Sequence, residues 1–365
     1  MNMPSAGLKP TPDSTSRQAG LAVRPMRGED IARWDDFVAN CPEATFFHRA
    51  GWKAVIERAF GHRTWFLLAE REGRIEGILP LAEIKSLLFG HSLASLPFCV
   101  YGGIAAESEA ARAALDQAAQ ELAAQRRVGH LEYRNMRPRE TRAQGGNWHG
   151  KDLYVTFRKE IDPDHEKNMQ AIPRKQRAMV RKGIKAGLQS EIDEGVDRFF
   201  EAYSTSVHRL GTPVFSKTYF RLLKEAFAED CEVLTIVKDG KLIASVLSFY
   251  FRDEVLPYYG GGMPEAREVA GNDFMYWELM RRSADRGYRV FDFGRSKQGT
   301  GSFDFKKNWG FEAQTLHYEY QLHRAKQVPD TNPLNPKYQL MIKTWQRMPI
   351  ALANAIGPHL VKYLG

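Results

Sequence analysis

Cationic side chains gather between residues 288 and 311, in the stretch YRVFDFGRSKQGTGSFDFKKNWGF. The pattern predicts a short apolar strand, VFDFG, then a Gly/Ser loop with Arg295 and Lys297, then an aromatic segment around Lys306. Cations at the end of a strand suit the binding of an anionic substrate or the stabilisation of a developing oxyanion. The same residue types also form solvated turns. Other parts of the chain must therefore decide between a functional site and a solvated turn.

A second group of cations repeats at helical spacing within a predicted pair of helices at about 163–185. Its basic stripe consists of Arg174, Arg177, Arg181 and Lys185, beside an apolar arc that includes Val180 and Ile184. Such a helix can dock through its apolar arc while the stripe meets phosphates of a nucleotide-linked sugar, a lipid-linked sugar or tRNA. A charge run is also the ordinary composition of a solvated face. Arg177 and Arg181 are the best-placed candidates.

Other polar side chains are candidates with ordinary structural alternatives. His208 has the usual pKa of a base for an amine, although a single helical histidine is more often structural. Tyr259 precedes three glycines at a predicted strand end, where a ligand could approach the backbone closely. Asp292 is a further candidate base, or a partner for a neighbouring cation. Cys99 lacks a recognisable histidine partner motif for a nucleophile.

The elements that position these residues follow the same order in both halves of the chain. The first half reads as a strand at 21–26, helices at 29–40 and 50–60, strands at 64–72 and 73–86, an extended run at 92–106, a helix at 107–127 and a strand at 130–136. The second reads as a strand at 153–161, helices within 163–185, a strand at 187–193, helices at 196–210 and 216–229, strands at 231–252 and 254–262, a helix at 272–287 and a strand at 290–294. This order predicts an α/β protein of two similar domains with mixed, largely antiparallel sheets. We expect a disordered tail at 1–20, domains at 21–152 and 153–323, and a helical extension at 324–365.

The composition is that of an ordinary globular protein with a basic balance. The 365 residues are 43% hydrophobic, enough for a large core in two domains. Lys and Arg number 52 against 44 Asp and Glu, a net charge of +8 (52 − 44), with a pI of about 9.2. This balance favours anionic partners, whether nucleic acid, phosphorylated ligands or an acidic membrane surface.

Cysteine usage and the chain ends favour a cytoplasmic location. Three widely separated cysteines, Cys41, Cys99 and Cys231, show no C-x-x-C spacing, so neither a disulfide framework nor a metal site is expected. Residues 1–20 lack the apolar core of a signal peptide. No apolar run approaches the roughly 20 residues of a spanning helix. The helical segment from about Tyr338 is a candidate for peripheral membrane contact, although packing back on a domain is the more ordinary outcome.

The chain resembles the FemAB family, whose members transfer aminoacyl or acyl groups to amines and are built from two acetyltransferase-like (GNAT) domains. The resemblance rests on the helix beginning Asn272-Asp273-Phe274, the strand Phe291-Asp292-Phe293-Gly294, and Phe305-Lys306 followed by Trp309-Gly310-Phe311. The basic stretch Arg174-Lys175-Gln176-Arg177 also resembles the family's Arg/Lys-rich helix near the start of its second domain. The likeness is strongest over about 150–320 and thinner over 21–150.

Two positions depart from the family's bridge-forming members, which usually have Asn-Pro at the helix start and a second Gly after Asp-Phe-Gly. Asp273 and Arg295 stand there in this chain, which weakens the case for a peptidoglycan-specific substrate. The chain is more similar to FemAB-like acetyltransferase proteins of Gram-negative bacteria. Some of those are associated with exosortase and exopolysaccharide (PEP-CTERM) loci, and the segment from Trp345 resembles theirs.

The resemblance implies that Lys306 stabilises a tetrahedral oxyanion during amide formation. It also implies substrate contacts at Tyr219, which follows the segment GTPVFSK, and at Asn272 and Arg295. The acetyl-CoA signature R/Q-x-x-G-x-G/A is absent, since REVAGND (267–273) has the wrong spacing. This absence weakens acetyl-CoA as the donor and leaves aminoacyl-tRNA or another acyl carrier open. The expected co-substrate is an acyl-CoA or an aminoacyl-tRNA, with no tightly bound cofactor and no metal.

The expected reaction is acyl or aminoacyl transfer to an amine on a cell-envelope substrate, by direct attack in a ternary complex. The acceptor would be a small molecule or a saccharide-linked amine, from a peptidoglycan precursor or an exopolysaccharide. The alternative is a non-catalytic GNAT-like protein that binds a phosphorylated saccharide or tRNA. DNA is not expected as a partner, because aromatic residues do not clearly interleave with the basic stripe.

Overall fold

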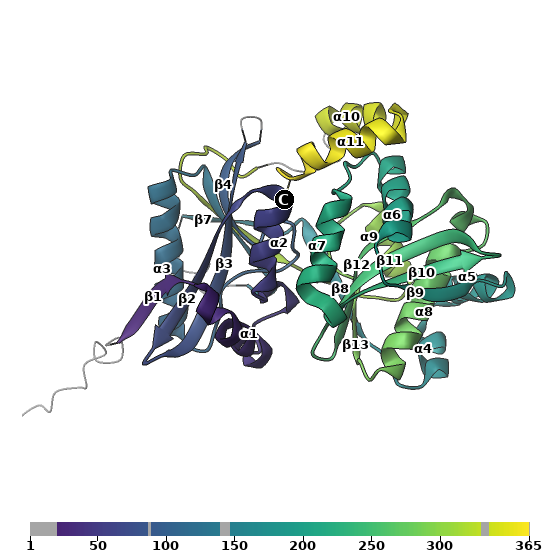
Figure 1. Ribbon diagram of the computed structural model, residues 1–365, viewed down its shortest axis with the longest axis horizontal. Coiled ribbons are helices and arrows are strands. Elements are labelled where there is room, and N and C mark those ends of the chain that lie inside the picture. Colours follow the sequence, from purple (N-terminus) through teal and green to yellow (C-terminus); the bar gives the residue numbers. More distant parts are fainter. Residues whose placement is uncertain (1–19, 87–88, 139–146, 330–335, 365) are drawn as a thin grey trace, which may run out of the picture.

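Two mixed β-sheets, one built mainly from each half of the chain, organise the molecule (Figure 1). The structure is a computed structural model that describes residues 20–86, 89–138, 147–329 and 336–364. The predicted tail at 1–20 therefore lies almost wholly outside the described residues.

The first sheet has the strand order β1-β2-β3-β4-β6-β16-β7, with β5 paired to β3. Its strands are β1 (Leu21–Pro25), β2 (Arg63–Arg71), β3 (Arg74–Ser86), β4 (Gly90–Ser95), β5 (Ala105–Ala106), β6 (His130–Asn135), β7 (Trp148–Lys151) and β16 (His317–Leu322). Its helices are α1 (Ile31–Asn40), α2 (Gly51–Phe60) and α3 (Glu109–Arg126). Side chains alternate along β2, so Phe66 packs with α1 and α2 whereas Leu67 packs with α3. The helices thus cover both faces of this sheet.

The second sheet has the order β14-β8-β13-β12-β11-β10-β9, with β15 paired to β8. Its strands are β8 (Tyr154–Glu160), β9 (Gln189–Asp193), β10 (Cys231–Lys238), β11 (Lys241–Phe251), β12 (Glu254–Gly262), β13 (Val290–Asp292), β14 (Ser296–Lys297) and β15 (Ala313–Thr315). Its helices are α4 (His165–Ala171), α5 (Arg174–Lys185), α6 (Asp197–Arg209), α7 (Lys217–Phe227), α8 (Gly271–Asp285) and α9 (Gly301–Asn308).

The same topological feature appears in each sheet, a parallel strand pair formed across a helical connection. In the first sheet, α3 leads from the β3–β5 region to β6, which pairs in parallel with β4. In the second sheet, α8 connects β12 to β13, and these strands pair in parallel only at Glu254↔Val290 and Val255↔Phe291. Beyond that point β12 and β13 diverge. The predicted α/β architecture of two similar mixed sheets with C-terminal helices is confirmed.

One strand joins a different sheet from the one expected. Residues 317–322 were expected inside a second domain at 153–323, but β16 pairs antiparallel with both β6 and β7 of the first sheet. β7 lies near the end of the first expected domain, 21–152, and residues 139–146 before it are outside the described part. β16 and β6 are more than 180 residues apart in the sequence, and pairing between such distant strands leaves no local signal. The sequence therefore could not indicate which sheet residues 317–322 join.

An aromatic core continues from one half of the molecule into the other. Phe46 of the first half stacks on Phe249 of β11 with ring centroids 4.4 Å apart, and its ring lies 4.7 Å from that of Phe227 at the end of α7. Trp52 of α2 is also buried against both of these second-half rings. The two halves are therefore held by a shared hydrophobic core.

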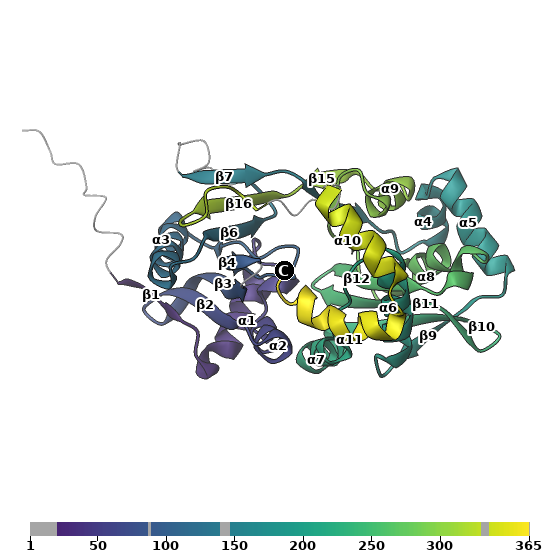
Figure 2. The ribbon, with the colours of Figure 1, turned by 90° about the horizontal axis from the view of Figure 1, so that it is seen from above.

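Two C-terminal helices, α10 (Pro336–Arg347) and α11 (Ile350–Val361), cross over α6 (Figures 1 and 2). Ala353, Gly357 and Val361 of α11 are buried at a spacing of four residues. A Cβ on Gly357 would lie 2.9 Å from the backbone nitrogen of Val214, so this helix sits directly on the chain after α6. Within the described residues, no helix has the length and apolar character needed to cross a membrane.

Candidate functional site

Lys306 lies on a short helix. The sequence predicted an aromatic segment around Lys306 without assigning its conformation, and residues 301–308 form α9. Phe303 and Phe305 of this helix pack on the second-half core, and Phe293 lies 6.3 Å from the Phe305 ring. The helical turn leaves Lys307 exposed and directs Lys306 toward the end of β13.

The Lys306 ammonium contacts the backbone that follows β13. Its Nζ donates to the carbonyl oxygens of Gly294 at 2.9 Å and Arg295 at 3.0 Å. The rings of Phe157 and Phe293 lie beside the Lys306 side chain, and their centroids are 5.8 and 6.0 Å from its Nζ. Burial lowers the pKa of Lys306 to about 7, against the opposing effect of the Asp292 carboxylate. This amine can thus exchange a proton near neutral pH.

The lowered pKa predicts a specific pH dependence of stability. Between about pH 7 and the usual lysine value of 10.5 the unfolded chain binds more protons at this residue than the folded chain, so folded-state stability rises with pH across that window. Lys306→Met removes this dependence. The unfolding free energy of the variant minus that of the native chain should therefore fall by about 1–3 kcal/mol between pH 7 and pH 10. Urea unfolding at several pH values measures the difference, and a pH-independent difference would contradict the shift.

Asp292 links the two halves of the chain beside Lys306. Its Oδ2 accepts from the Tyr101 hydroxyl at 3.0 Å and lies 3.4 Å from the Arg158 guanidinium. Its Oδ1 accepts from the backbone N–H of Gly294 at 2.7 Å and from the Thr156 hydroxyl at 3.2 Å. The sequence raised Asp292 as a candidate base. Its oxygens are instead engaged by four donors in a buried position, which is the geometry of a structural carboxylate.

A loop from the first half reaches across the point where β12 and β13 diverge. Its backbone carbonyls at Phe98 and Val100 accept hydrogen bonds from Tyr258 of β12 at 2.9 Å and from Tyr318 of β16 at 2.7 Å. Tyr101 continues the same loop to Asp292. Phe98 has a φ of +72°, in the left-handed region that is uncommon for a bulky residue. This loop therefore contacts both diverging strands.

Arg295 lies where the two sheets meet. Its guanidinium donates to the Tyr318 hydroxyl at 3.0 Å and stacks 4.6 Å from the ring centroid of Tyr154. Burial alone would lower its pKa, but the phenols of Tyr318 and Tyr154 raise the pKa of Arg295 overall. Lys297 is 5.5 Å from the same Tyr154 ring, and burial lowers its pKa. The two loop cations thus lie against aromatic rings from both sheets.

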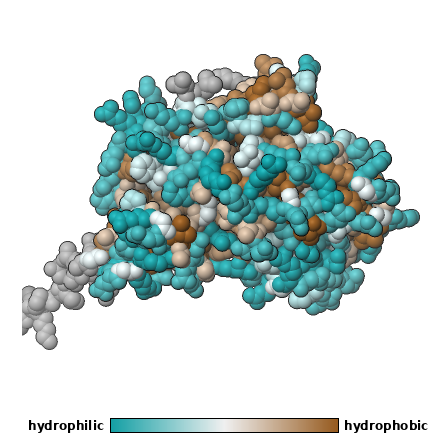
Figure 3. Space-filling view, viewed as in Figure 1, coloured by the Kyte–Doolittle hydropathy of each residue, from teal (hydrophilic) through white to brown (hydrophobic). Residues whose placement is uncertain are grey.

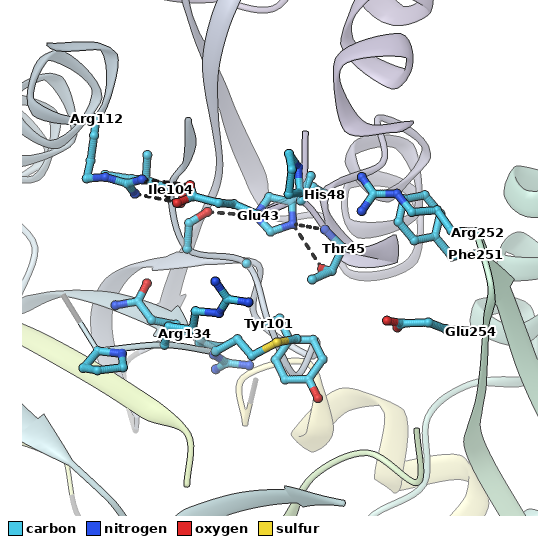
Figure 4. Close-up of a pocket in the computed structure, with 18 of the residues that line it drawn as sticks. Glu43, Thr45, His48, Tyr101, Ile104, Arg112, Arg134, Phe251, Arg252 and Glu254 are labelled. Atoms are coloured by element: carbon cyan, nitrogen blue, oxygen red, sulfur yellow. Dashed lines mark hydrogen bonds and ion pairs between the residues drawn. The ribbon is translucent and has the colours of Figure 1, made fainter. Parts of the chain in front are cut away.

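A cavity of about 450 Å³ opens between the two halves on the Tyr101 side of Asp292 (Figure 4). Charged and polar side chains from both halves line it, including Glu43, His48, Arg112, Arg134, Arg158, Arg252 and Glu254. One nitrogen of the Arg112 guanidinium, Nη2, donates to both carboxylate oxygens of Glu43, at 2.7 and 2.8 Å. On the opposite wall, Arg158 pairs with Glu254. Burial raises the pKa of the Glu254 carboxyl.

Two of these residues are fixed by backbone carbonyls. His48 Nε2 lies 2.9 Å from the Gly103 carbonyl oxygen, and burial lowers the pKa of His48 to about 4, so the ring is neutral at pH 7. Arg252 donates to the carbonyl oxygens of Val38 at 2.6 Å and Cys41 at 2.7 Å. The cavity therefore has rigid walls that carry charges of both signs.

The cavity and Lys306 lie on opposite faces of β8 and β13. Thr156 and Arg158 point to the cavity side with Asp292, whereas Phe157 and Phe293 point to the side of Lys306. The segment from Asp292 to Arg295 lies between them. The Asp292 side chain bonds to Tyr101 of the cavity wall, and the carbonyl oxygens of Gly294 and Arg295 accept from the Lys306 ammonium.

The basic helix is formed as expected, but its two candidates differ. The Arg177 guanidinium donates to the carbonyl oxygens of Gln170 at 3.1 Å and Ile172 at 3.2 Å, so it closes the end of α4. Arg181 is exposed to solvent. The Gln176 amide, next to Arg177 in the sequence, donates to the buried Asp273 carboxylate at 2.8 Å. Arg181 therefore lies on the solvent-exposed face of α5, whereas the Arg177 guanidinium is used in contacts within the fold.

The remaining predicted site residues lie apart from Lys306. Tyr219 and Tyr259 are buried and bonded to each other, with their hydroxyl oxygens 2.9 Å apart. The His208 Nε2 is 2.8 Å from the Met348 carbonyl oxygen and contacts the C-terminal helices. Asn272 is at the start of α8, and its Oδ1 is buried without a hydrogen-bond partner. These four residues do not form one site with Lys306.

The glycines after Tyr259 have a packing explanation. A Cβ on Gly261 would lie 2.5 Å from the carbonyl oxygen of Ala202, so the residue lets β12 approach the backbone of α6. The sequence suggested that a ligand could approach the backbone at these glycines. In the structure it is α6 that packs closely against Gly261. Cys99 is also buried, and burial raises its pKa, which keeps the thiol protonated.

Sequence reasoning missed the cavity residues, above all Tyr101, Arg158 and Glu254. Arg158 carried a usable signal, because a charged residue in the predicted strand at 153–161 needs a partner if the strand is central. Tyr101 carried none, since it reaches Asp292 through the contact between the two halves. Glu254 carried none, since it meets Arg158 only when β8 and β12, far apart in the sequence, come together in the second sheet. In the described part of the chain, no three His, Cys, Asp or Glu side chains gather in a way that could hold a metal ion.

Comparison with protein families relates the second half to acyltransferases. Residues 174–307 match the family described as acetyltransferase (GNAT) domain, and this range includes both α5 and Lys306. The match covers 134 of 365 residues (174 to 307), so it concerns this part of the chain alone. No curated protein matches the chain.

Solved structures share the architecture of both halves. The crystal structure of FemX is similar with a TM-score of 0.67 and 16% identity, covering 88% of this chain and 100% of that chain. A tandem GNAT protein from the clavulanic acid biosynthesis pathway covers 84% of this chain and 100% of its own at 15% identity and a TM-score of 0.53. The C-terminal domain of a putative lysylphosphatidylglycerol synthetase from Agrobacterium fabrum covers 81% and 92% at 15% identity and a TM-score of 0.56. At these identities the likeness establishes the fold, a tandem GNAT-type arrangement.

Proposed function

We propose that this protein transfers an acyl or aminoacyl group to an amine, with Lys306 as the catalytic residue. The observation that supports this most directly is the Lys306 ammonium, half-buried beside the end of β13 with its pKa lowered to about 7. The match of residues 174–307 to an acetyltransferase domain supports the same class of reaction.

The proposed reaction forms one bond and breaks one. The neutral amine of the acceptor attacks the carbonyl carbon of an ester or thioester donor, and the C–N bond forms as a tetrahedral oxyanion develops. The Lys306 ammonium stabilises that negative charge. The carbon–oxygen or carbon–sulfur bond to the carrier then breaks, and the proton lost by the amine goes to the leaving alcohol or thiol, with Lys306 as its carrier.

We assign the acceptor to the cavity between the two halves. Glu43 and Glu254 supply carboxylates for an ammonium group, and Arg112 and Arg134 supply donors for saccharide oxygens or a phosphate. An amine on a cell-envelope saccharide, from an exopolysaccharide or a peptidoglycan precursor, fits this mixture of charges. A cytoplasmic location, where activated donors are available, goes with this proposal.

The donor carries phosphates in either form considered, an acyl-CoA or an aminoacyl-tRNA. The start of α8 is a poor place for a diphosphate, because the buried Asp273 carboxylate already accepts from Gln176 at 2.8 Å and from the Trp309 indole at 3.0 Å. A second anion there would meet like charge. We therefore assign phosphate contact to the exposed face of α5, and this favours the aminoacyl-tRNA.

Arg181→Ala should weaken donor binding without affecting the fold. The exposed guanidinium neutralises about one phosphate, so the slope of log K against log salt should decrease in magnitude by about one. Filter binding of bulk tRNA at several salt concentrations measures the slope. Arg63→Ala, an exposed arginine of the first half, is the matched control and should leave the slope unchanged. Equal slopes for all three proteins would remove α5 from the donor site.

The proposed activity is tested by following a label. The protein is incubated with labelled acyl-CoA and, separately, with labelled aminoacyl-tRNA, each with a cell-envelope extract as the acceptor source. Transfer of label to an extract component, absent in Lys306→Met, supports the enzyme. Retention of both labels by their carriers, together with saturable binding of a phosphorylated saccharide, would favour the non-catalytic binding protein instead.

A further inference from the structure

The C-terminal segment from residue 340 carries most of the exposed large apolar side chains in the described part of the chain. Eleven such side chains are exposed, and six of them lie at or after residue 340. These six are Leu340, Met341, Ile350, Leu352, Ile356 and Leu364. Figure 3 shows a brown area at the top of the molecule, where α10 and α11 lie in Figure 1. We call this group the C-terminal apolar patch.

The patch is not needed to seat the helices. The buried face of α11 is formed by Ala353, Gly357 and Val361, and Leu352 and Ile356 lie outside that face and are exposed. On α10, the inward contact comes from Ile342, whose Cγ2 would lie 2.5 Å from a Cβ on Gly211, while Leu340 is 70% exposed. The outward side chains thus leave apolar area in contact with water that the fold does not use.

The same segment is free of negative charge. No Asp or Glu occurs after Asp330, whereas the whole chain contains 44 of them. Four basic residues lie in this segment, and Lys343 and Arg347 are exposed one turn apart on α10. Apolar and basic side chains without acidic ones form the composition of a helix that rests on an anionic lipid surface.

Both helices lie on one side of the molecule. They form its upper edge in Figure 1 and face the viewer in Figure 2, so a flat surface can contact α10 and α11 together. His208 and Gln346 fix the hairpin to the end of α6, because His208 bonds to the Met348 carbonyl and Gln346 donates to the Arg209 carbonyl at 2.8 Å. The patch is therefore presented by a seated hairpin rather than by a loose tail.

We propose that α10 and α11 form a monotopic membrane-docking surface for anionic lipid. The apolar patch enters the headgroup boundary, and Lys343 and Arg347 contact lipid phosphates. This inference is independent of the transfer reaction, because it uses no residue of the catalytic segment. It extends that reaction by bringing the protein to the surface where lipid-linked saccharides are found.

Co-sedimentation of the full-length protein with vesicles tests the proposal. We expect binding to vesicles of phosphatidylcholine with 30% phosphatidylglycerol, at least tenfold weaker binding to phosphatidylcholine alone, and a decrease with added salt. The double variant Leu352→Glu/Ile356→Glu should lose at least tenfold in affinity, and Lys343→Glu/Arg347→Glu should do the same. Ile31→Glu, an exposed apolar position of α1, is the matched control and should bind as the native chain does.

Two results would overturn the proposal. One is equal sedimentation of the native chain with and without anionic vesicles. The other is a dimer in solution, measured by light scattering without lipid, that Leu352→Glu/Ile356→Glu converts to monomer, since the patch would then be covered by a second copy. Circular dichroism and the thermal unfolding midpoint of each variant establish that lost binding is not lost folding.

Discussion

Replacing Lys306 with methionine should lower kcat at least 100-fold and leave the fold intact. The two side chains have similar length, so the methionine fills the same space among Phe157 and Phe293 but offers no charge to the oxyanion. Removing a single oxyanion donor typically costs about 10²–10³ in kcat. Once a donor and acceptor are identified, single-turnover transfer of label measures the effect. Lys307→Met, the exposed neighbour, is the control and should keep the native rate.

The pH profile distinguishes the two roles open to Lys306. If the ammonium stabilises the oxyanion, the charged form is active, and kcat should fall as pH rises through about 7, the pKa that burial gives Lys306. Lys306→Arg keeps a permanent charge, so its lower rate should not fall over the same range. A native rate that rises through pH 7 would contradict the oxyanion role and identify Lys306 as a base. A rate unaffected by Lys306→Met would remove the residue from the mechanism.

The local elements of the second half could be read from the sequence because each has its own periodic signal. The helix beginning at residue 272 and the strand pair at 231–252 were predicted within a few residues of α8, β10 and β11. The conformation around Lys306 was not predicted, because Phe303, Phe305 and Lys306 fit both a short helix and an extended segment. Packing of the two rings on the second-half core selects the helix.

The relation between the two halves could not be read in the same way. β16 crosses into the first sheet, and the loop carrying Tyr101 reaches into the second half, yet both are ordinary strand and loop sequences. The β6 partner of β16 and the Asp292 partner of Tyr101 are each more than 180 residues away in the sequence. The sequence therefore indicated which residues are chemically capable, such as Lys306 and Arg295. It did not indicate the cavity, whose two walls face each other only because the two halves are in contact.

Asp292→Ala should destabilise the protein by about 3–5 kcal/mol, the largest stability effect that we expect from a single substitution. The carboxylate is buried and accepts from Tyr101, Thr156 and the Gly294 backbone, while Arg158 lies 3.4 Å away. Removing it leaves these donors unsatisfied and the partly buried guanidinium with Glu254 alone. Urea unfolding of variant and native chain measures the loss.

The Asp292 substitutions also test whether this residue couples the two halves to Lys306. Asp292→Asn keeps the shape and part of the hydrogen bonding, so its loss should be smaller than that of alanine. Asp304→Ala, an exposed carboxylate on α9, should change stability by about 0.5 kcal/mol or less. Because Asp292 fixes the Gly294 N–H and Lys306 contacts the Gly294 carbonyl, Asp292→Asn should also lower kcat in the folded protein. An Asp292→Ala protein as stable as Asp304→Ala would show that the Asp292 network contributes nothing to joining the halves. Lys306 would then depend on its own carbonyl contacts alone.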